Sequence, residues 1–424
     1  MHHFDYRDGQ LFAEDVAVEK IVAAAGSPVY IYSSATIERH YTLYRNALGP
    51  RAHVFYAMKA NSNLGVLMTL ARLGAGADVV SEGEIRKALA AGIPASRIVF
   101  SGVGKTEAEL TYAVSSGIYQ INIESEGELE ALSRVASRLG KIQHAVFRVN
   151  PDIGAGGHAK ITTGSSANKF GVSFDEAERL YARGSNMPGV RIVGLAVHIG
   201  SQILEFGPME QAYLKLRGLV DRLNEQGFKV ERLDLGGGVG VPYEVPAPFE
   251  YGPDVIERYA AMVRHVTEGL DAELGFEPGR VIVANAGILV TRALYVNGRT
   301  DRQFLVVDAA MNDLVRPAMY EAYHEIWPVN KPAPDAAIVA YDVVGPICES
   351  GDTFAVGRRM PRVHPGELVA FQSAGAYGAA MSSTYNQRPL VAEVLVKGAD
   401  FAITRPRQTY EELLSQDRAP GWFA

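Results

Sequence analysis

Eight short apolar segments of strand type recur between Ala52 and Glu277, and amphipathic segments rich in Ala, Leu and Glu lie between them. This alternation is expected of a parallel sheet whose strands are joined by helices. Eight strands within about 230 residues favour a closed (β/α)8 barrel over an open doubly wound sheet, because closure leaves no strand edge exposed. The predicted strands are residues 53–58, 77–80, 97–100, 119–123, 144–149, 192–198, 232–235 and 274–277.

Four of the predicted helices begin with a shared signal, a Ser or Thr three residues before a Glu. In that arrangement each side chain can accept a hydrogen bond from an amide of the first turn that has no partner within the helix. The pairs are Ser81 with Glu84, Thr106 with Glu109, Ser125 with Glu128, and Ser173 with Glu176.

Beyond Arg280 the apolar runs become alternating and rich in Val, which predicts a mostly antiparallel β domain with strands in residues 281–290, 303–309, 336–344, 367–373 and 389–396. The start of the chain is also β-like, with a hairpin turn at Asp8-Gly9 and a strand at 29–33. We therefore expect residues 1–34 to join a C-terminal β domain of residues 283–424, with the barrel, residues 35–282, inserted between them. A glycine-rich segment, 151–171, is long enough to be either functional or disordered.

Composition excludes several classes of partner. The net charge is −7 and like charges form no block, so neither nucleic acid nor an anionic membrane is expected to bind. The only cysteine, Cys348, cannot form an internal disulfide. The chain shows no secretory signal and no apolar run long enough to span a bilayer, so we expect a cytoplasmic protein.

The residues that follow the barrel strands are the candidates for chemistry, because active sites of such barrels lie at the carboxyl ends of the strands. Lys59 follows the first strand between apolar neighbours, so desolvation would lower its pKa and free an amine for a Schiff base. A lysine that merely extends along the rim is the alternative. Glycines 236–238 and the turn 277–280 follow the seventh and eighth strands, where barrels commonly bind phosphate, although a glycine run can also be a simple tight turn.

Three further side chains point to a flat cofactor with a phosphate. His198 could stack on an aromatic ring, Ser201 could bind phosphate, and Glu277 could pair with a protonated pyridine nitrogen. An amine, a phosphate site, a stacking partner and a carboxylate are the requirements of pyridoxal 5'-phosphate. The sequence contains neither of the common nucleotide-binding glycine motifs and no His/Cys cluster with metal spacing, so no metal is expected.

Nine segments, in order and across about 320 residues, resemble the fold-type III pyridoxal-phosphate decarboxylases. The resemblance is greatest to those members that act on diaminopimelate. The segments are YAMKAN (56–61), GADVVSEGE (76–84), NKFGV (168–172), HIGSQ (198–202), LDLGGG (233–238), EPGR (277–280), DLVRPAMY (313–320), CESGD (348–352) and AGAYG (374–378).

The resemblance implies a role for each candidate residue. Lys59 would attach the cofactor covalently, His198 would stack on its ring, and Glu277 would pair with its nitrogen. Its phosphate would be held by Ser201, Gly238, Gly279, Arg280 and Tyr377.

For the substrate, the resemblance implies that Cys348 donates the proton that replaces carbon dioxide. The substrate's retained carboxylate would be bound by Arg280, Arg316 and Tyr320, with Tyr377 nearby, and its distal ammonium by Glu349. Cys348 and Glu349 would come from the partner chain of a homodimer with shared active sites.

The activity implied is decarboxylation of meso-2,6-diaminopimelate to L-lysine and carbon dioxide, the last step of lysine biosynthesis. Related decarboxylases of ornithine, arginine or carboxynorspermidine are alternatives, although Arg316 favours a substrate with a second carboxylate. A non-enzymatic homologue that binds pyridoxal phosphate is a third possibility. The β domain and the presence of both Lys59 and Cys348 argue against it.

Overall fold

The structure is a computed structural model that describes residues 2–154, 169–244, 254–298 and 302–423. It divides into two compact units, each treated by itself below. The barrel unit comprises Glu38–Val241 and Glu250–Ile282, and the β unit comprises Met1–Ile37, Pro242–Phe249 and Val283–Ala424. Within the described ranges, no helix combines the length and apolar character needed to cross a lipid bilayer.

In the barrel unit, eight parallel strands form a closed ring in which each strand pairs with the next and β12 pairs with β5. All eight strands predicted from the apolar runs are present, so the prediction of a (β/α)8 barrel is confirmed. Nearly every strand residue is buried, as expected of strands covered on both faces. The strands are β5 (Ala52–Ala57), β6 (Gly76–Val79), β7 (Ile98–Phe100), β8 (Gln120–Ile123), β9 (Gln143–Val149), β10 (Val190–Val197), β11 (Arg232–Asp234) and β12 (Glu273–Phe276).

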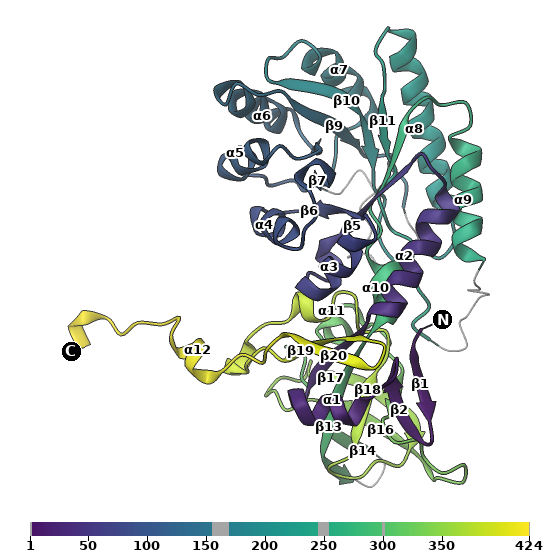
Figure 1. Cartoon of the computed structure of the whole chain (residues 1–424), viewed down its shortest axis with the longest axis vertical. Coiled ribbons are helices and arrows are strands. Elements are labelled where there is room, and N and C mark those ends of the chain that lie inside the picture. Colours follow the sequence, from purple (N-terminus) through teal and green to yellow (C-terminus); the bar gives the residue numbers. More distant parts are fainter. Residues whose placement is uncertain (1, 155–168, 245–253, 299–301, 424) are drawn as a thin grey trace. The chain divides into compact units, whose positions relative to one another are not determined.

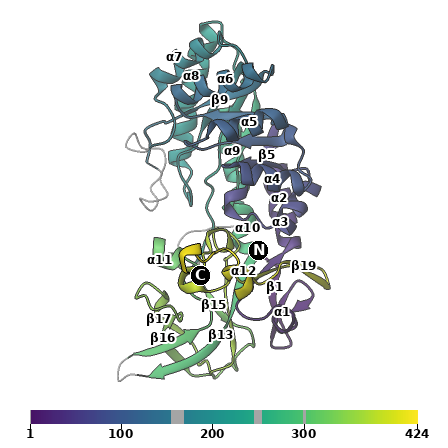
Figure 2. The same cartoon turned by 90° about the vertical axis from the view of Figure 1, so that its left-hand side faces the viewer.

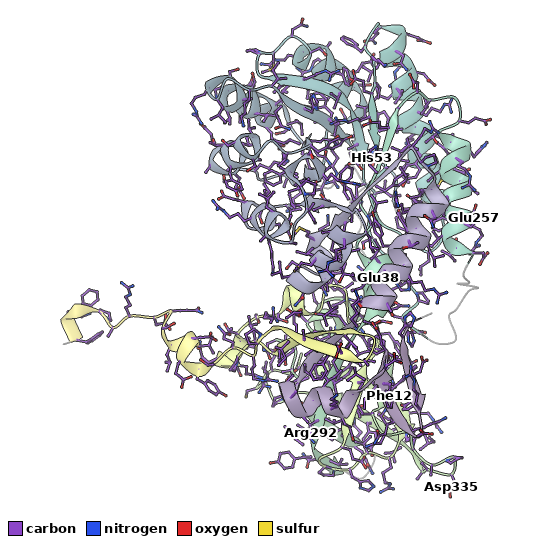
Figure 3. The ribbon with its side chains drawn as sticks, viewed as in Figure 1. Phe12, Glu38, His53, Glu257, Arg292 and Asp335 are labelled. Atoms are coloured by element: carbon purple, nitrogen blue, oxygen red, sulfur yellow. The ribbon has the colours of Figure 1, made fainter. Side chains whose placement is uncertain are left out.

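Helices surround this ring (Figures 1 and 2). Their buried residues are mostly apolar. In Figure 3, His53 marks β5 and Glu257 marks one of the outer helices. The helices are α2 (Ser34–Leu48), α3 (Leu64–Arg72), α4 (Glu82–Ala90), α5 (Glu107–Ser116), α6 (Glu126–Arg138), α7 (Phe174–Gly184), α8 (Gly207–Glu225), α9 (Val255–Val266) and the short α10 (Arg280–Val283).

All four predicted Ser or Thr caps accept a hydrogen bond from the amide three residues on. The reciprocal bond, in which the amide of the cap residue donates to the Glu carboxylate, is present at Thr106. At Ser81 and Ser125, which are fully extended with φ of −159° and −161°, the Glu instead accepts from the amide one residue earlier. The signal therefore located the helix starts, whereas the amide that the Glu binds differs from one start to the next.

The β unit is built on a sheet in the order β17-β16-β14-β13-β4-β19-β20, to which β18 and β15 add. Strand β4 (Val29–Ser33) lies between β13 (Gly287–Gly298) and β19 (Ala392–Lys397), so the two ends of the chain share one sheet (Figure 1). This confirms that the barrel is inserted in a β domain. The other strands are β14 (Gln303–Val307), β15 (Ile326–Pro328), β16 (Ile338–Val344), β17 (Thr353–Pro361), β18 (Leu368–Phe371) and β20 (Asp400–Arg405).

One face of this sheet packs against helix α1 (Val18–Ala25) and a separate three-stranded sheet of β1 (Phe4–Arg7), β2 (Gln10–Ala13) and β3 (Val16–Ala17). The turn between β1 and β2 is at Asp8-Gly9, as predicted, with positive φ at both residues. Two pairings of the large sheet, β14 with β16 and β4 with β19, are parallel, and its other pairings are antiparallel.

One predicted strand was partly wrong. Residues 281–286 are helical, forming most of α10 and a 3-10 turn (Ala284–Ala286), and β13 begins only at Gly287. A short apolar run is compatible with either a buried strand or a buried helix, so its periodicity could not decide. Of the glycine-rich segment predicted at 151–171, only residues 151–154 and 169–171 lie within the described ranges.

Candidate active site

A cavity of about 180 Å³ opens among residues at the carboxyl ends of the barrel strands. This is the end at which barrels of this kind bind their ligands. Its polar lining residues are Lys59, Ser101, Asn122, Arg148, His198 and Glu277. Three of the residues predicted from sequence are thus brought to one cavity.

Lys59 lies in a 3-10 turn (Met58–Ala60) directly after β5, and its side chain is 38% exposed. Its Nζ donates a hydrogen bond to Oδ2 of Asp78 at 2.7 Å. The carboxylate of Asp78, on β6, is completely buried, and its Oδ1 has no hydrogen-bond partner among the described residues. The structure therefore shows an ion pair between Lys59 and Asp78 that was not predicted from the sequence around Lys59.

His198 follows β10, and its Nδ1 accepts a hydrogen bond from the amide of Gly237 at 3.3 Å. Burial, followed by the positive charges of Arg148 and Lys59, lowers the pKa of His198 well below its ordinary value of 6.5. The ring is therefore neutral near pH 7, and the lone pair of Nδ1 accepts the hydrogen bond from the glycine turn. A neutral imidazole is suited to lie against an aromatic ring that carries positive charge.

Glu277 is buried, and its Oε1 accepts hydrogen bonds from Ser101 Oγ at 3.3 Å and from Asn122 Nδ2 at 3.2 Å. Burial and the neighbouring charges of Asp234 and Asp78 raise the pKa of Glu277 well above its ordinary value. Burial also raises the pKa of Asp234 to about 6. Three carboxyl groups within one barrel favour a ligand that brings a proton or a positive charge, and the protonated nitrogen of a pyridine ring is such a group.

The glycine turn after β11 brings backbone amides close to two other loops. A side chain at Gly237 is impossible because its Cβ would lie 2.2 Å from the carbonyl oxygen of Glu277. At Gly238, φ is +115° and a Cβ would lie 2.6 Å from the carbonyl oxygen of Gly200. Close backbone approach of this kind is what a phosphate site requires.

Arg280 is buried beside this turn, and its guanidinium donates to Ser201 Oγ from Nε at 3.3 Å and from Nη2 at 3.0 Å. Gly279 packs tightly against the turn that follows β5, since a Cβ at Gly279 would lie 2.9 Å from Cβ of Ala60. The structure thus brings together the predicted arginine and serine, and it places the predicted glycines against the loop that carries Lys59. The donor set fits a cofactor with an aldehyde, a basic ring and a phosphate.

The other five candidates lie on the β unit. Arg316 begins the short helix α11 (Arg316–Tyr320), is buried, and lies over the ring of Tyr243 at 4.3 Å. Its Nη1 donates to Nε2 of His324 at 2.8 Å, and Nδ1 of His324 is hydrogen-bonded to the carbonyl oxygen of Gln372. Because arginine only donates, Nε2 is the acceptor and Nδ1 carries the proton. Tyr320, four residues after Arg316, is partly exposed.

Cys348 and Glu349 lie in an exposed turn between β16 and β17. The turn is held by buried Asp352, whose Oδ2 accepts the amide of Ile347 at 2.7 Å and whose Oδ1 accepts the amide of Met311 at 2.6 Å. Tyr377 has φ of +56°, a left-handed conformation that is rare for a non-glycine residue.

Sequence reasoning missed several functional neighbours, and their signals differ. Asp78 and Asp234 are carboxylates inside otherwise apolar strands, which was a visible sign of an inward-facing polar group. His324 and Tyr243 carried no such local signal, because their contact with Arg316 depends on the folded chain.

Comparisons with known proteins agree on the family. Residues 34–284 match the family described as pyridoxal-dependent decarboxylase, pyridoxal binding domain. A diaminopimelate decarboxylase from Pseudomonas aeruginosa is 48% identical over 414 residues, which are 97% of this chain and 98% of the relative.

Solved structures give the same result. Diaminopimelate decarboxylase from Helicobacter pylori, complexed with L-lysine, superimposes with a TM-score of 0.89 at 38% identity and covers 94% of this chain and 98% of that one. The M. jannaschii enzyme, in co-complex with L-lysine, has a TM-score of 0.92 at 32% identity over 100% of both chains. The chain belongs to the pyridoxal-dependent decarboxylase family and, within it, to the diaminopimelate decarboxylases.

Proposed function

We propose that this chain binds pyridoxal 5'-phosphate and decarboxylates meso-2,6-diaminopimelate to L-lysine and carbon dioxide. The observation that carries the proposal is the single cavity that Lys59, His198 and Glu277 line at the mouth of the barrel. L-Lysine, the expected product, is bound in the solved structures of the Helicobacter pylori and M. jannaschii relatives.

When bound, the cofactor supplies a ring that accepts the electrons left behind by the departing carbon dioxide. The protein must hold that ring and keep its nitrogen protonated. Lys59 supplies the amine for covalent attachment, Glu277 pairs with the ring nitrogen, and His198 packs against the ring face. Residues proposed to hold the phosphate are Ser201, Gly238, Gly279, Arg280 and Tyr377.

The substrate is the more specific part of the proposal. Diaminopimelate carries an amine and a carboxylate at its far end, so it needs both an acidic and a basic partner. Glu349 is proposed for the amine, and Arg280, Arg316, Tyr320 and Tyr377 for the carboxylate. Cys348 is proposed to deliver a proton to the carbon that has lost carbon dioxide. We further propose that the protein is a cytoplasmic homodimer in which a second copy contributes Cys348 and Glu349.

The purified protein, loaded with pyridoxal phosphate, is offered diaminopimelate, ornithine, arginine and carboxynorspermidine in turn, while carbon dioxide and the amine product are measured. Release from diaminopimelate alone supports the proposal. Release from ornithine or carboxynorspermidine but not from diaminopimelate contradicts the substrate assignment. Binding of the cofactor without release from any of the four favours a regulatory homologue.

The residue roles are tested by substitution. Lys59→Ala should abolish turnover and covalent attachment of the cofactor, while Lys229→Ala, a control at an exposed lysine of the same unit, should leave both unchanged. Cys348→Ala should retain cofactor binding and lose turnover. Mixing the inactive Lys59→Ala and Cys348→Ala proteins should restore activity if each site combines two chains, and no recovery would count against shared sites.

A further inference from the structure

Glu124 is the first residue after β8 and has no role in the function proposed above. Its side chain is buried, and its two carboxylate oxygens accept hydrogen bonds from three segments of the barrel unit. Oε1 accepts from the amide of Gly102 at 2.9 Å, and Oε2 accepts from the amide of Gly171 at 3.2 Å. Arg148 Nη1 donates to both oxygens, at 3.1 Å and 3.2 Å.

Arg148 is the residue through which Glu124 reaches the cavity. It lies on β9, is 9% exposed, lines the cavity, and holds its guanidinium over the ring of Phe170 at 4.7 Å. A buried guanidinium is costly unless a counter-charge lies beside it. Glu124 supplies this charge and, by binding one nitrogen of the planar fork, also sets the direction of the other nitrogens.

The backbone groups bound by Glu124 have additional tethers. The carbonyl oxygen of Gly102 accepts from Lys105 Nζ at 2.6 Å, and the residue after Gly171 pairs with the backbone of β9. The guanidinium of Arg148 is held by fewer interactions apart from those to Glu124. Beyond Glu124, its hydrogen bond to the described chain is a long one, 3.5 Å from Nη2 to the carbonyl oxygen of His198. Loss of the Glu124 carboxylate should therefore release Arg148 before it disturbs the backbone.

We propose that Glu124 is a positioning residue of the active site, which acts by holding the Arg148 guanidinium in the cavity wall. The inference rests on the proposed function, because a fixed positive charge favours ligands that carry phosphate and carboxylate groups. A charge that is already in place costs no reorganisation when such a ligand binds. A mobile arginine would have to be ordered first, and the binding energy would be reduced accordingly.

The test is the affinity of the full-length apoprotein for pyridoxal phosphate, measured by titration of the visible absorption of the bound cofactor. Glu124→Gln keeps the size of the side chain and removes its charge, and it should weaken binding by about tenfold or more. Glu126→Gln is the matched control, because Glu126 begins α6, is partly exposed, and pairs with Arg179 on the surface. It should bind pyridoxal phosphate with an affinity within about twofold of the wild type. In binding free energy, this is less than half of the change expected for Glu124→Gln.

A second comparison separates positioning from a purely structural role. In an Arg148→Met background, adding Glu124→Gln should change the affinity by less than about twofold, because the group that Glu124 holds is gone. This double variant also leaves no buried charge unpaired, so it tests the inference even where the single variant fails to fold. A folded Glu124→Gln protein that binds like the wild type, or an additive loss in the double variant, overturns the inference. Failure of the wild type itself to bind the cofactor would instead contradict the proposed function.

Discussion

Asp234 gives the sharpest stability prediction, because the structure buries its carboxylate with half of its hydrogen-bonding capacity unused. The residue is 2% exposed on β11; its Oδ1 accepts the amide of Gly236 at 2.9 Å, and its Oδ2 has no hydrogen-bond partner among the described residues. Burial, with a further contribution from Asp78, raises the pKa of Asp234 from 3.8 to about 6. A rise of roughly two pKa units corresponds to a destabilisation on the order of 3 kcal/mol, which is shared with the neighbouring carboxyl of Glu277, whose pKa the charge of Asp234 also raises.

Asp234→Asn should therefore stabilise the apoprotein at neutral pH. The amide keeps an oxygen for Gly236 and removes the charge. Because the pKa is higher in the folded state than in the unfolded state, the folded protein is penalised as pH rises from about 4 to 6 and carries the full penalty above about pH 7. The advantage of the variant should grow from near zero at pH 4 to about 3 kcal/mol at pH 8.

Urea unfolding of apoprotein and variant at pH 4 to 8 measures this difference directly. Asp221→Asn is the control, because Asp221 is exposed on α8 and should give a small difference with no such pH dependence. A difference between Asp234→Asn and the wild type that stays flat with pH, or that falls as pH rises, would refute the reasoning. Agreement would establish that the barrel interior holds carboxylates at a cost to stability.

Three further substitutions test contacts at the site. Gly238→Ala should lower the free energy of unfolding by about 2–3 kcal/mol in a thermal unfolding assay and should weaken cofactor binding. Gly227→Ala is the control, because φ is also positive there but no atom lies within 4 Å of the new Cβ. It should lower the free energy of unfolding by about 1 kcal/mol in the same assay. Asp352→Asn leaves one of two amides without an acceptor and should lower the free energy of unfolding by about 1–3 kcal/mol in chemical unfolding. The control Asp335→Asn, at an exposed residue marked in Figure 3, should not lower it. Ser201→Ala removes the acceptor of the two arginine hydrogen bonds and should weaken cofactor binding by about fivefold in the absorption titration, and unchanged binding would count against a phosphate role for this loop.

The barrel could be predicted from sequence because its strands are buried on both faces and appear as continuous apolar runs. Four of the runs are followed by a Ser or Thr helix cap, and helical segments separate the runs, so the type and order of these elements could be predicted. Residues 281–286 lacked that punctuation, and the same apolar character there belongs to a helix. The pairing of β4 with β19, about 360 residues apart, could be expected in outline, but its parallel direction depends on the folded sheet.

The site was predictable at the ends of the strands and much less so inside them. Lys59, His198 and Glu277 follow strands, and a closed barrel must bring such residues to one rim. Asp78 binds Lys59 and Glu124 binds Arg148 from neighbouring strands or strand ends, and nothing in the sequence states which neighbour each carboxylate faces. Asp352 was visible in the CESGD segment, but the two amides that it binds come from separate parts of the chain.

Buried carboxyl groups in the barrel core lower the stability of the fold, and a bound ligand can offset that cost. A core selected for stability alone would be apolar at Asp78, Asp234 and Glu277. Instead the fold keeps three acidic groups close to one another, and burial raises the pKa of both Asp234 and Glu277. Any ligand that places positive charge beside Glu277 relieves this cost, so its binding energy includes what the empty fold had lost. The cost of burying these carboxyl groups and the proposed affinity for a protonated ring would therefore be two consequences of the same arrangement.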